Sequence, residues 1–274
     1  MKRPLNRNSP IDANRMADWV ATFSNYRYAV NEQRIDRWLG QFQRRDTDIA
    51  ARILDCVDFI TNQQIDNAFR NGLLAVPGWH REQRGRSGKW RFVAYSRSAG
   101  ESGDTMLHHF RRSNNLALKS FDELFIHKSD LVRETLGHED TVVFVDDFSG
   151  SGKQVTDNWP ELKELVTGNP RAFLVLVASS QIAQSRIERD TDLSAISQIT
   201  ITDEDNVFSA RCRFFSPEER DRILHYCNRA DPRNPRGFGD IGSLIVFAHD
   251  CPNNSIPILH ASSRGWRGLF PRFT

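Results

Sequence analysis

The chain has 274 residues, of which 39% are hydrophobic and 26% are charged, a balance typical of globular proteins and unlike that of disordered ones. Lysine and arginine number 37 and aspartate and glutamate 35, so the net charge of +2 says nothing about nucleic acid as a partner. No apolar run approaches the ~20 residues of a membrane span and the first residues lack the apolar core of a signal peptide, so we expect a cytoplasmic protein without a membrane.

The first third of the chain predicts amphipathic helices. Apolar residues recur three or four positions apart, the spacing that places one stripe along a helix, and the first two of four stripes follow the i, i+3, i+4, i+7 pattern. The stripes are Met16, Trp19, Val20 and Phe23; Ile35, Trp38, Leu39 and Phe42; Ile49, Ile53, Val57 and Ile60; and Ile65, Phe69 and Leu73. We expect residues 1–85 to form a helical region of their own, separate from a second domain over residues 86–274.

From about residue 90 onward, short apolar runs alternate with helical patterns. Strands are expected at residues 91–96, 141–147, 172–179, 196–202 and 243–250, with helices at 104–112, 151–166 and 216–228. The alternation predicts an α/β fold with a mainly parallel sheet flanked by helices. Residues 142–145 are apolar throughout, which predicts a central strand buried on both faces.

The segment "VVFVDDFSGSGKQ", residues 142–154, combines a buried strand, two carboxylates and a glycine-rich loop that leads into a helix. One interpretation is a Walker A loop of a P-loop-type NTPase. That loop needs a leading glycine and a hydroxyl residue after its lysine, but Asp147 and Gln154 occupy those positions. A carboxylate at the entrance of a phosphate cradle would also repel a triphosphate, so this is the weaker interpretation.

The second interpretation is a site for a ribose 5-phosphate. Parallel strands end in the crevice where α/β proteins bind ligands, and Asp146 and Asp147 could accept hydrogen bonds from two ribose hydroxyls. The helix that follows would place its positive N-terminal end near one phosphate. Both carboxylates can reach one ligand only if the strand has ended and the backbone turns at Asp147. The expected phosphate-binding residues are Ser149, Gly150, Ser151, Gly152, Lys153 and Gln154.

This pattern resembles the diphosphate-sugar signature of type I phosphoribosyltransferases. Ser151-Gly152 stands where that family usually has Thr-Gly, Gln154 replaces a usual hydroxyl residue, and Lys153 adds an unusual charge. Together with "GESGDTMLHHFR" and "CPNNSIPILH…GWRGLFPR", the motif resembles the phosphoribosyltransferase-like proteins encoded in bacterial conflict and antiphage gene clusters, some of them beside reverse transcriptases in retrons. The resemblance covers about residues 90–274.

The resemblance implies a phosphoribosyltransferase that binds phosphoribosyl diphosphate with Mg²⁺, the metal being held through the ligand and not directly by the protein. Asp146 and Asp147 would be the catalytic residues. A loop after the first strand of the sheet would bind pyrophosphate, with candidates Arg97, Gly100, Glu101, Ser102 and Gly103. A C-terminal hood would contact the base, with candidates His249, Asn253 and Asn254.

The function expected from the resemblance is transfer of phosphoribosyl, or cleavage of the N-glycosidic bond, by an effector of antiphage defence. One alternative is a non-catalytic module that senses a nucleotide and passes its state through the N-terminal helices to a protein partner. In a retron that partner would be a reverse transcriptase with its nucleic acid. Another alternative is a toxin that acts on a cellular nucleotide or nucleic acid.

Overall fold

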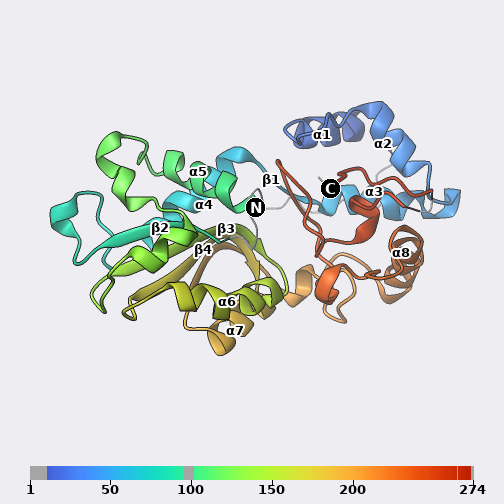
Figure 1. Ribbon diagram of the computed structural model, residues 1–274. Coiled ribbons are helices and arrows are strands. Elements are labelled where there is room, and N and C mark those ends of the chain that lie inside the picture. Colours follow the sequence, from blue (N-terminus) through green and yellow to red (C-terminus); the bar gives the residue numbers. More distant parts are fainter. Residues whose placement is uncertain (1–10, 96–101, 264, 273–274) are drawn as a thin grey trace. The chain divides into compact units, whose positions relative to one another are not determined.

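The computed structural model describes residues 11–95, 102–263 and 265–272. Contacts within the chain divide it into two compact units, one of residues 1–62 and 201–274 and the other of residues 63–200 (Figure 1). Each unit has its own sheet. No helix in the described part of the chain is long and apolar enough to cross a membrane.

The unit of residues 63–200 is built on a four-stranded sheet in the order β2-β3-β4-β5. The strands are β2 (Trp90–Ala94), β3 (Thr141–Ser149), β4 (Arg171–Ser180) and β5 (Ser194–Ile201). β3 pairs in parallel with both β2 and β4. Its residues 142–145 have no exposed surface, so the predicted central strand buried on both faces is confirmed.

Helices cover both faces of this sheet (Figure 1). One face carries α4 (Asn62–Leu74) and α5 (Ser102–Ser113), and the other carries α6 (Lys153–Leu165) and α7 (Gln181–Asp190). On the first face, Phe110 lies edge-on to Phe92 of β2 at 5.2 Å between ring centroids. On the second, Trp159 of α6 lies edge-on to Phe144 of β3 at 5.8 Å. The predicted α/β fold with a parallel sheet flanked by helices is confirmed.

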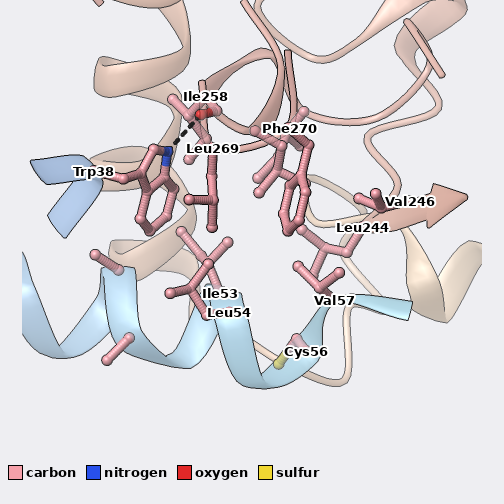
Figure 2. Packing of buried hydrophobic residues seen from close by; sticks show 14 of the residues in the cluster. Trp38, Ile53, Leu54, Cys56, Val57, Leu244, Val246, Ile258, Leu269 and Phe270 are labelled. Atoms are coloured by element: carbon pink, nitrogen blue, oxygen red, sulfur yellow. Dashed lines mark hydrogen bonds between the residues drawn. The ribbon is translucent and has the colours of Figure 1, made fainter. Parts of the chain in front are cut away.

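The other unit joins the two ends of the chain. It holds α1 (Ala13–Phe23), α2 (Glu32–Leu39), α3 (Thr47–Cys56) and α8 (Pro217–Ala230). A parallel pair of short strands, β1 (Asp58–Ile60) and β6 (Ile245–Phe247), connects these ends. In the shared core the indole N–H of Trp38 donates to the carbonyl of Ile258 at 2.8 Å (Figure 2).

Two details of the N-terminal region differ from expectation. The helix expected to continue through Ile60 ends at Cys56, and the residues that follow form β1 beside β6. The four helices also do not share one layer. The apolar stripes of α1, α2 and α3 are buried against residues 207–270 in one hydrophobic core, whereas nearly all of α4 belongs to the other unit. The division into domains at residue 85 stays a prediction.

Candidate functional site

The turn expected at Asp147 is absent, because β3 continues past both aspartates to Ser149. Asp146 is in register with Leu176 of β4 and Ser149 with Ser179. Pairing with β4 therefore keeps β3 extended beyond Asp147, the residue at which the strand was expected to end. Since successive strand residues point to opposite faces, the two carboxylates lie on opposite sides of the sheet.

Asp146 lies on the face that α6 covers. Its side chain is buried, with 7% of the residue exposed, and its Oδ1 accepts the N–H of Asp147 at 2.9 Å. Burial raises the pKa of the neighbouring Tyr95 above its ordinary value, and the carboxylate of Asp146 adds to this rise. The Tyr95 hydroxyl donates to the carbonyl of Val155 on α6 at 2.6 Å. Asp146 thus belongs to a buried polar group between β3 and α6.

Asp147 lies on the opposite face of β3 and is only partly buried. Asp147 lies two residues after Val145, and Val145 pairs with Ala94, the last residue of β2. Asp147 therefore lies at the carboxyl end of two neighbouring parallel strands. That edge of a parallel sheet is the usual place for a ligand in an α/β protein. Of the two aspartates, Asp147 is therefore the one positioned to face a ligand.

The glycine-rich loop after β3 is held in place by β4 and α7. The Ser180 hydroxyl donates to the carbonyl of Gly150, and Arg186 Nη1 donates to the carbonyl of Ser151 at 2.9 Å. The Gly152 carbonyl accepts the N–H of Thr156 at 3.0 Å, as the first bond of α6. Three consecutive carbonyls of the loop are thus bound within the protein.

These bonds also orient the N–H groups of the loop. In a trans peptide the N–H points opposite to the carbonyl of the preceding residue. Because the carbonyls of Gly150 and Ser151 point toward β4 and α7, the N–H groups of Ser151 and Gly152 point away from them. Within the described residues, neither N–H donates a hydrogen bond. Two N–H groups directed outward ahead of a helix N-terminus form a suitable phosphate cradle.

Two structural features favour glycine at position 152. Its φ is +73°, a left-handed conformation that side chains disfavour. A Cβ at this position would also lie 3.1 Å from both the Cα and the carbonyl oxygen of Ala183. The loop therefore approaches α7 so closely that a side chain here would push the two apart by a few tenths of an ångström.

Lys153 and Gln154 are exposed in the first turn of α6. Lys153 Nζ forms an ion pair with Asp157 Oδ2 at 2.8 Å, one turn along the helix. Exposed pairs of this kind contribute little to stability, so this lysine could exchange its partner for a bound phosphate at small cost.

Of the pyrophosphate-loop candidates, Arg97, Gly100 and Glu101 lie outside the described residues. Ser102 and Gly103 open α5, although their side chains are not described. Tyr95, the last described residue before this segment, donates its N–H to the carbonyl of Val145 at 2.8 Å. These candidates stay a prediction.

The base-hood candidates belong to the other compact unit. Asn254 is 6% exposed, and its amide donates to the carbonyl of Phe238 at 2.8 Å. The carbonyl of Asn253 accepts the N–H of Phe238 at 2.8 Å, and that of His249 accepts from Arg27 at 3.3 Å. These bonds stabilise their own unit, and a role in contacting a base stays a prediction.

Sequence reasoning missed α7 and, with it, Ser180 and Arg186. Ser180 also caps α7, since its Oγ accepts the N–H of Ala183 at 2.9 Å. The sequence signal for α7 was weak: Ser180 as a possible N-cap, followed by Ala183 and Ile187, the two buried residues of the helix. Such a sparse stripe does not distinguish a helix from a polar loop.

The described residues contain no group of three or more His, Cys, Asp or Glu side chains close enough to hold a metal ion. A magnesium ion at this loop would therefore take its oxygens mainly from its ligand, as expected, with the carboxylate of Asp147 nearby. Carboxylate together with phosphate oxygens is the usual donor set of Mg²⁺, so the residues present are compatible with that metal.

Comparisons with known proteins agree with the resemblance seen in the motif. No curated protein matches the chain. The model of the PRTase-CE family matches residues 35–272, well over half of the chain. The match begins inside the N-terminal helical region and includes residues of both compact units. The chain therefore belongs to the PRTase-CE family of phosphoribosyltransferase-like proteins associated with conflict systems.

Proposed function

We propose that the loop between β3 and α6 binds the 5-phosphate of phosphoribosyl diphosphate, with Asp147 at the ribose hydroxyls. The observation that carries this proposal is the orientation of the loop. Its carbonyls are bound by Ser180, Arg186 and Thr156, and this turns two N–H groups outward at the start of a 13-residue helix. The positive N-terminal end of α6 and the guanidinium of Arg186 beside the loop both favour a negatively charged ligand.

Asp146 has a different role in this proposal from the one expected from the sequence. A buried carboxylate that accepts the N–H of Asp147 fixes the backbone at the end of β3. It thereby holds Asp147 in the orientation that faces the ligand. Asp146 is therefore a positioning residue in this account, and Asp147 is the one that contacts the sugar.

The proposed reaction is phosphoribosyl transfer. A nitrogen nucleophile attacks the anomeric carbon while the bond from that carbon to the pyrophosphate oxygen breaks, and pyrophosphate leaves with its electron pair. Bound magnesium would supply positive charge for the leaving pyrophosphate. The protein holds the 5-phosphate through backbone N–H groups, which keeps the ribose fixed while the anomeric bond changes. The association of the family with conflict systems favours a role in antiphage defence.

A non-catalytic ligand sensor is the second candidate. It is favoured by one observation, that the strand register puts Asp147 but not Asp146 on the ligand side of β3, so one of the two expected catalytic carboxylates does not face the ligand. A partner reached through the N-terminal helices would have to use their polar faces, because Trp19, Phe23 and Trp38 are buried in the core.

Exchange of labelled pyrophosphate into phosphoribosyl diphosphate, measured with Mg²⁺ and mixtures of nucleobases or nucleotides, separates the two candidates. A transferase incorporates label, and the Asp147→Asn variant loses incorporation. Ligand binding by calorimetry with no incorporation of label would favour the sensor. Absence of both binding and exchange would contradict the proposal as a whole.

A further inference from the structure

A large cavity lies between α2 and the C-terminal segment, within the unit of residues 1–62 and 201–274. Its volume is about 950 Å³, near the upper end of the ~300–1,000 Å³ typical of small-molecule sites. The described residues that line it all belong to this one unit, and none of them belongs to the β3–α6 loop.

The wall of this cavity is strongly cationic. Arg34 and Arg37 come from one face of α2, and Arg267 comes from the C-terminal segment. The described residues that line the cavity include no aspartate or glutamate. In the described part of the chain, none of the three arginines forms an ion pair; Arg34 donates to the carbonyl of Ala29 and Arg37 to the side chain of Gln33. Three guanidinium groups around one cavity favour an anionic occupant.

The two walls are fixed to each other by hydrogen bonds. Gln41 accepts the N–H of Arg267 at 2.7 Å and donates to its carbonyl at 2.9 Å. The indole N–H groups of Trp38 and Trp266 both donate to the carbonyl of Ile258, at 2.8 Å and 3.0 Å. The two backbone segments that carry the arginines are therefore held in place before a ligand binds. This lowers the backbone entropy lost on binding.

A second cavity of about 740 Å³ shares Ser262, Ser263 and Pro271 with the first. It adds Arg233 and Arg272 to the lining. Among the described lining residues the one carboxylate is Asp231, and Arg272 Nε also lies 4.0 Å from Asp250 Oδ2. Asp231 accepts hydrogen bonds from the N–H of Arg233 and the amide of Asn234, so part of its acceptor capacity is used within the protein. The positive lining thus extends over an adjoining pair of cavities.

We propose that this pair of cavities binds a nucleoside triphosphate. The triphosphate would lie among Arg34, Arg37 and Arg267, since guanidinium groups form paired hydrogen bonds with phosphate oxygens. The amide NH2 of Gln33, which also lines the cavity, is a group suited to the edge of a base. The site is independent of the proposed β3–α6 loop, so either can fail without the other.

The test measures ATP binding by calorimetry to four forms of the full chain. These are the natural protein, the double variant Arg37→Gln with Arg267→Gln, the charge-matched control Arg44→Gln with Arg236→Gln, and Asp147→Asn. Arg44 and Arg236 are exposed in the same unit and line neither cavity. An oligothymidylate of ten nucleotides is titrated in parallel, to distinguish a nucleotide from a nucleic acid strand.

We expect ATP affinity to fall at least tenfold in the cavity double variant, because hydrogen bonds between charged partners contribute roughly a factor of ten or more each. The control and Asp147→Asn should bind as the natural protein does. Three results would overturn the proposal: no ATP binding by the natural protein, equal affinity in the cavity variant, or binding of the oligonucleotide at least tenfold tighter than ATP.

Discussion

At the scale of single residues, the path of the loop in the candidate site depends on Gly152. Its backbone conformation and its contact with α7 both disfavour a Cβ. The Gly152→Ala variant should lose about 1–3 kcal/mol of unfolding free energy. Its affinity for phosphoribosyl diphosphate should fall as well, since the loop must move away from Ala183. Urea unfolding and calorimetry would measure the two effects.

Gly78 provides a matched control in the same compact unit. Its φ is +83°, but a Cβ there would make only ordinary contacts of 3.6–3.9 Å. Gly78→Ala therefore introduces the backbone strain without the crowding. Equal losses of stability in the two variants would show that the close approach of the loop to α7 has no energetic weight.

A second residue-scale prediction concerns Asp46, which is 3% exposed beside α8. Burial by itself would raise the pKa of Asp46, but hydrogen bonds from Tyr226 and Arg222 outweigh it and hold the pKa below its ordinary value. A carboxylate with a lowered folded-state pKa stabilises the fold above the unfolded-state pKa of about 4 and loses that contribution as pH falls through the folded value.

Below about pH 4 the natural protein should therefore lose stability, and part of this acid dependence should disappear in Asp46→Asn. The variant should also lose about 1–3 kcal/mol at neutral pH, because it weakens hydrogen bonds to a charged group. Unfolding followed against pH would show both effects. The exposed Asp48 serves as a control, and an Asp48→Asn variant that behaves like Asp46→Asn would contradict the assignment.

At the scale of elements, α7 supports the β3–α6 loop. Ser180 connects three parts, since its hydroxyl donates to Gly150 and accepts from Ala183 at the start of the helix. Ser180→Ala should lower the unfolding free energy by about 1–2 kcal/mol as a lost cap and loop contact. It should also weaken phosphoribosyl diphosphate binding severalfold. Ser185→Ala, on the exposed side of the same helix, should change neither. Unchanged ligand affinity in Ser180→Ala would show that α7 does not position the loop.

The elements also show which sequence signals were sufficient. The continuous apolar run 142–145 identified a central strand, because only burial on both faces requires apolar residues at consecutive positions. The residue at which this strand ends could not be predicted from the apolar pattern. Whether β3 stops at Asp146 or Ser149 depends on the register with β4, a contact between distant parts of the sequence. For the same reason the separation of Asp146 from Asp147 was missed.

At the scale of the whole molecule, the connection between the two ends of the chain had no local signal. The stripes of α1, α2 and α3 required an apolar partner surface, but nothing in their spacing identified residues 207–270 as that surface. β1 is three residues long and was hidden at the end of a helical pattern. The family motif was visible because its residues are contiguous in the sequence, while its supports, Ser180 and Arg186, lie about 30 residues further on.

The central claim is that the β3–α6 loop binds phosphoribosyl diphosphate through Asp147. Calorimetric titration of this compound with Mg²⁺ into the natural protein, Asp147→Asn and Asp146→Asn tests it most directly. Because hydrogen bonds to a charged group contribute about 1.5–3 kcal/mol, Asp147→Asn should weaken binding about tenfold to a hundredfold with little loss of stability. Asp146→Asn should reduce both affinity and stability. Unchanged affinity in both variants would contradict the account.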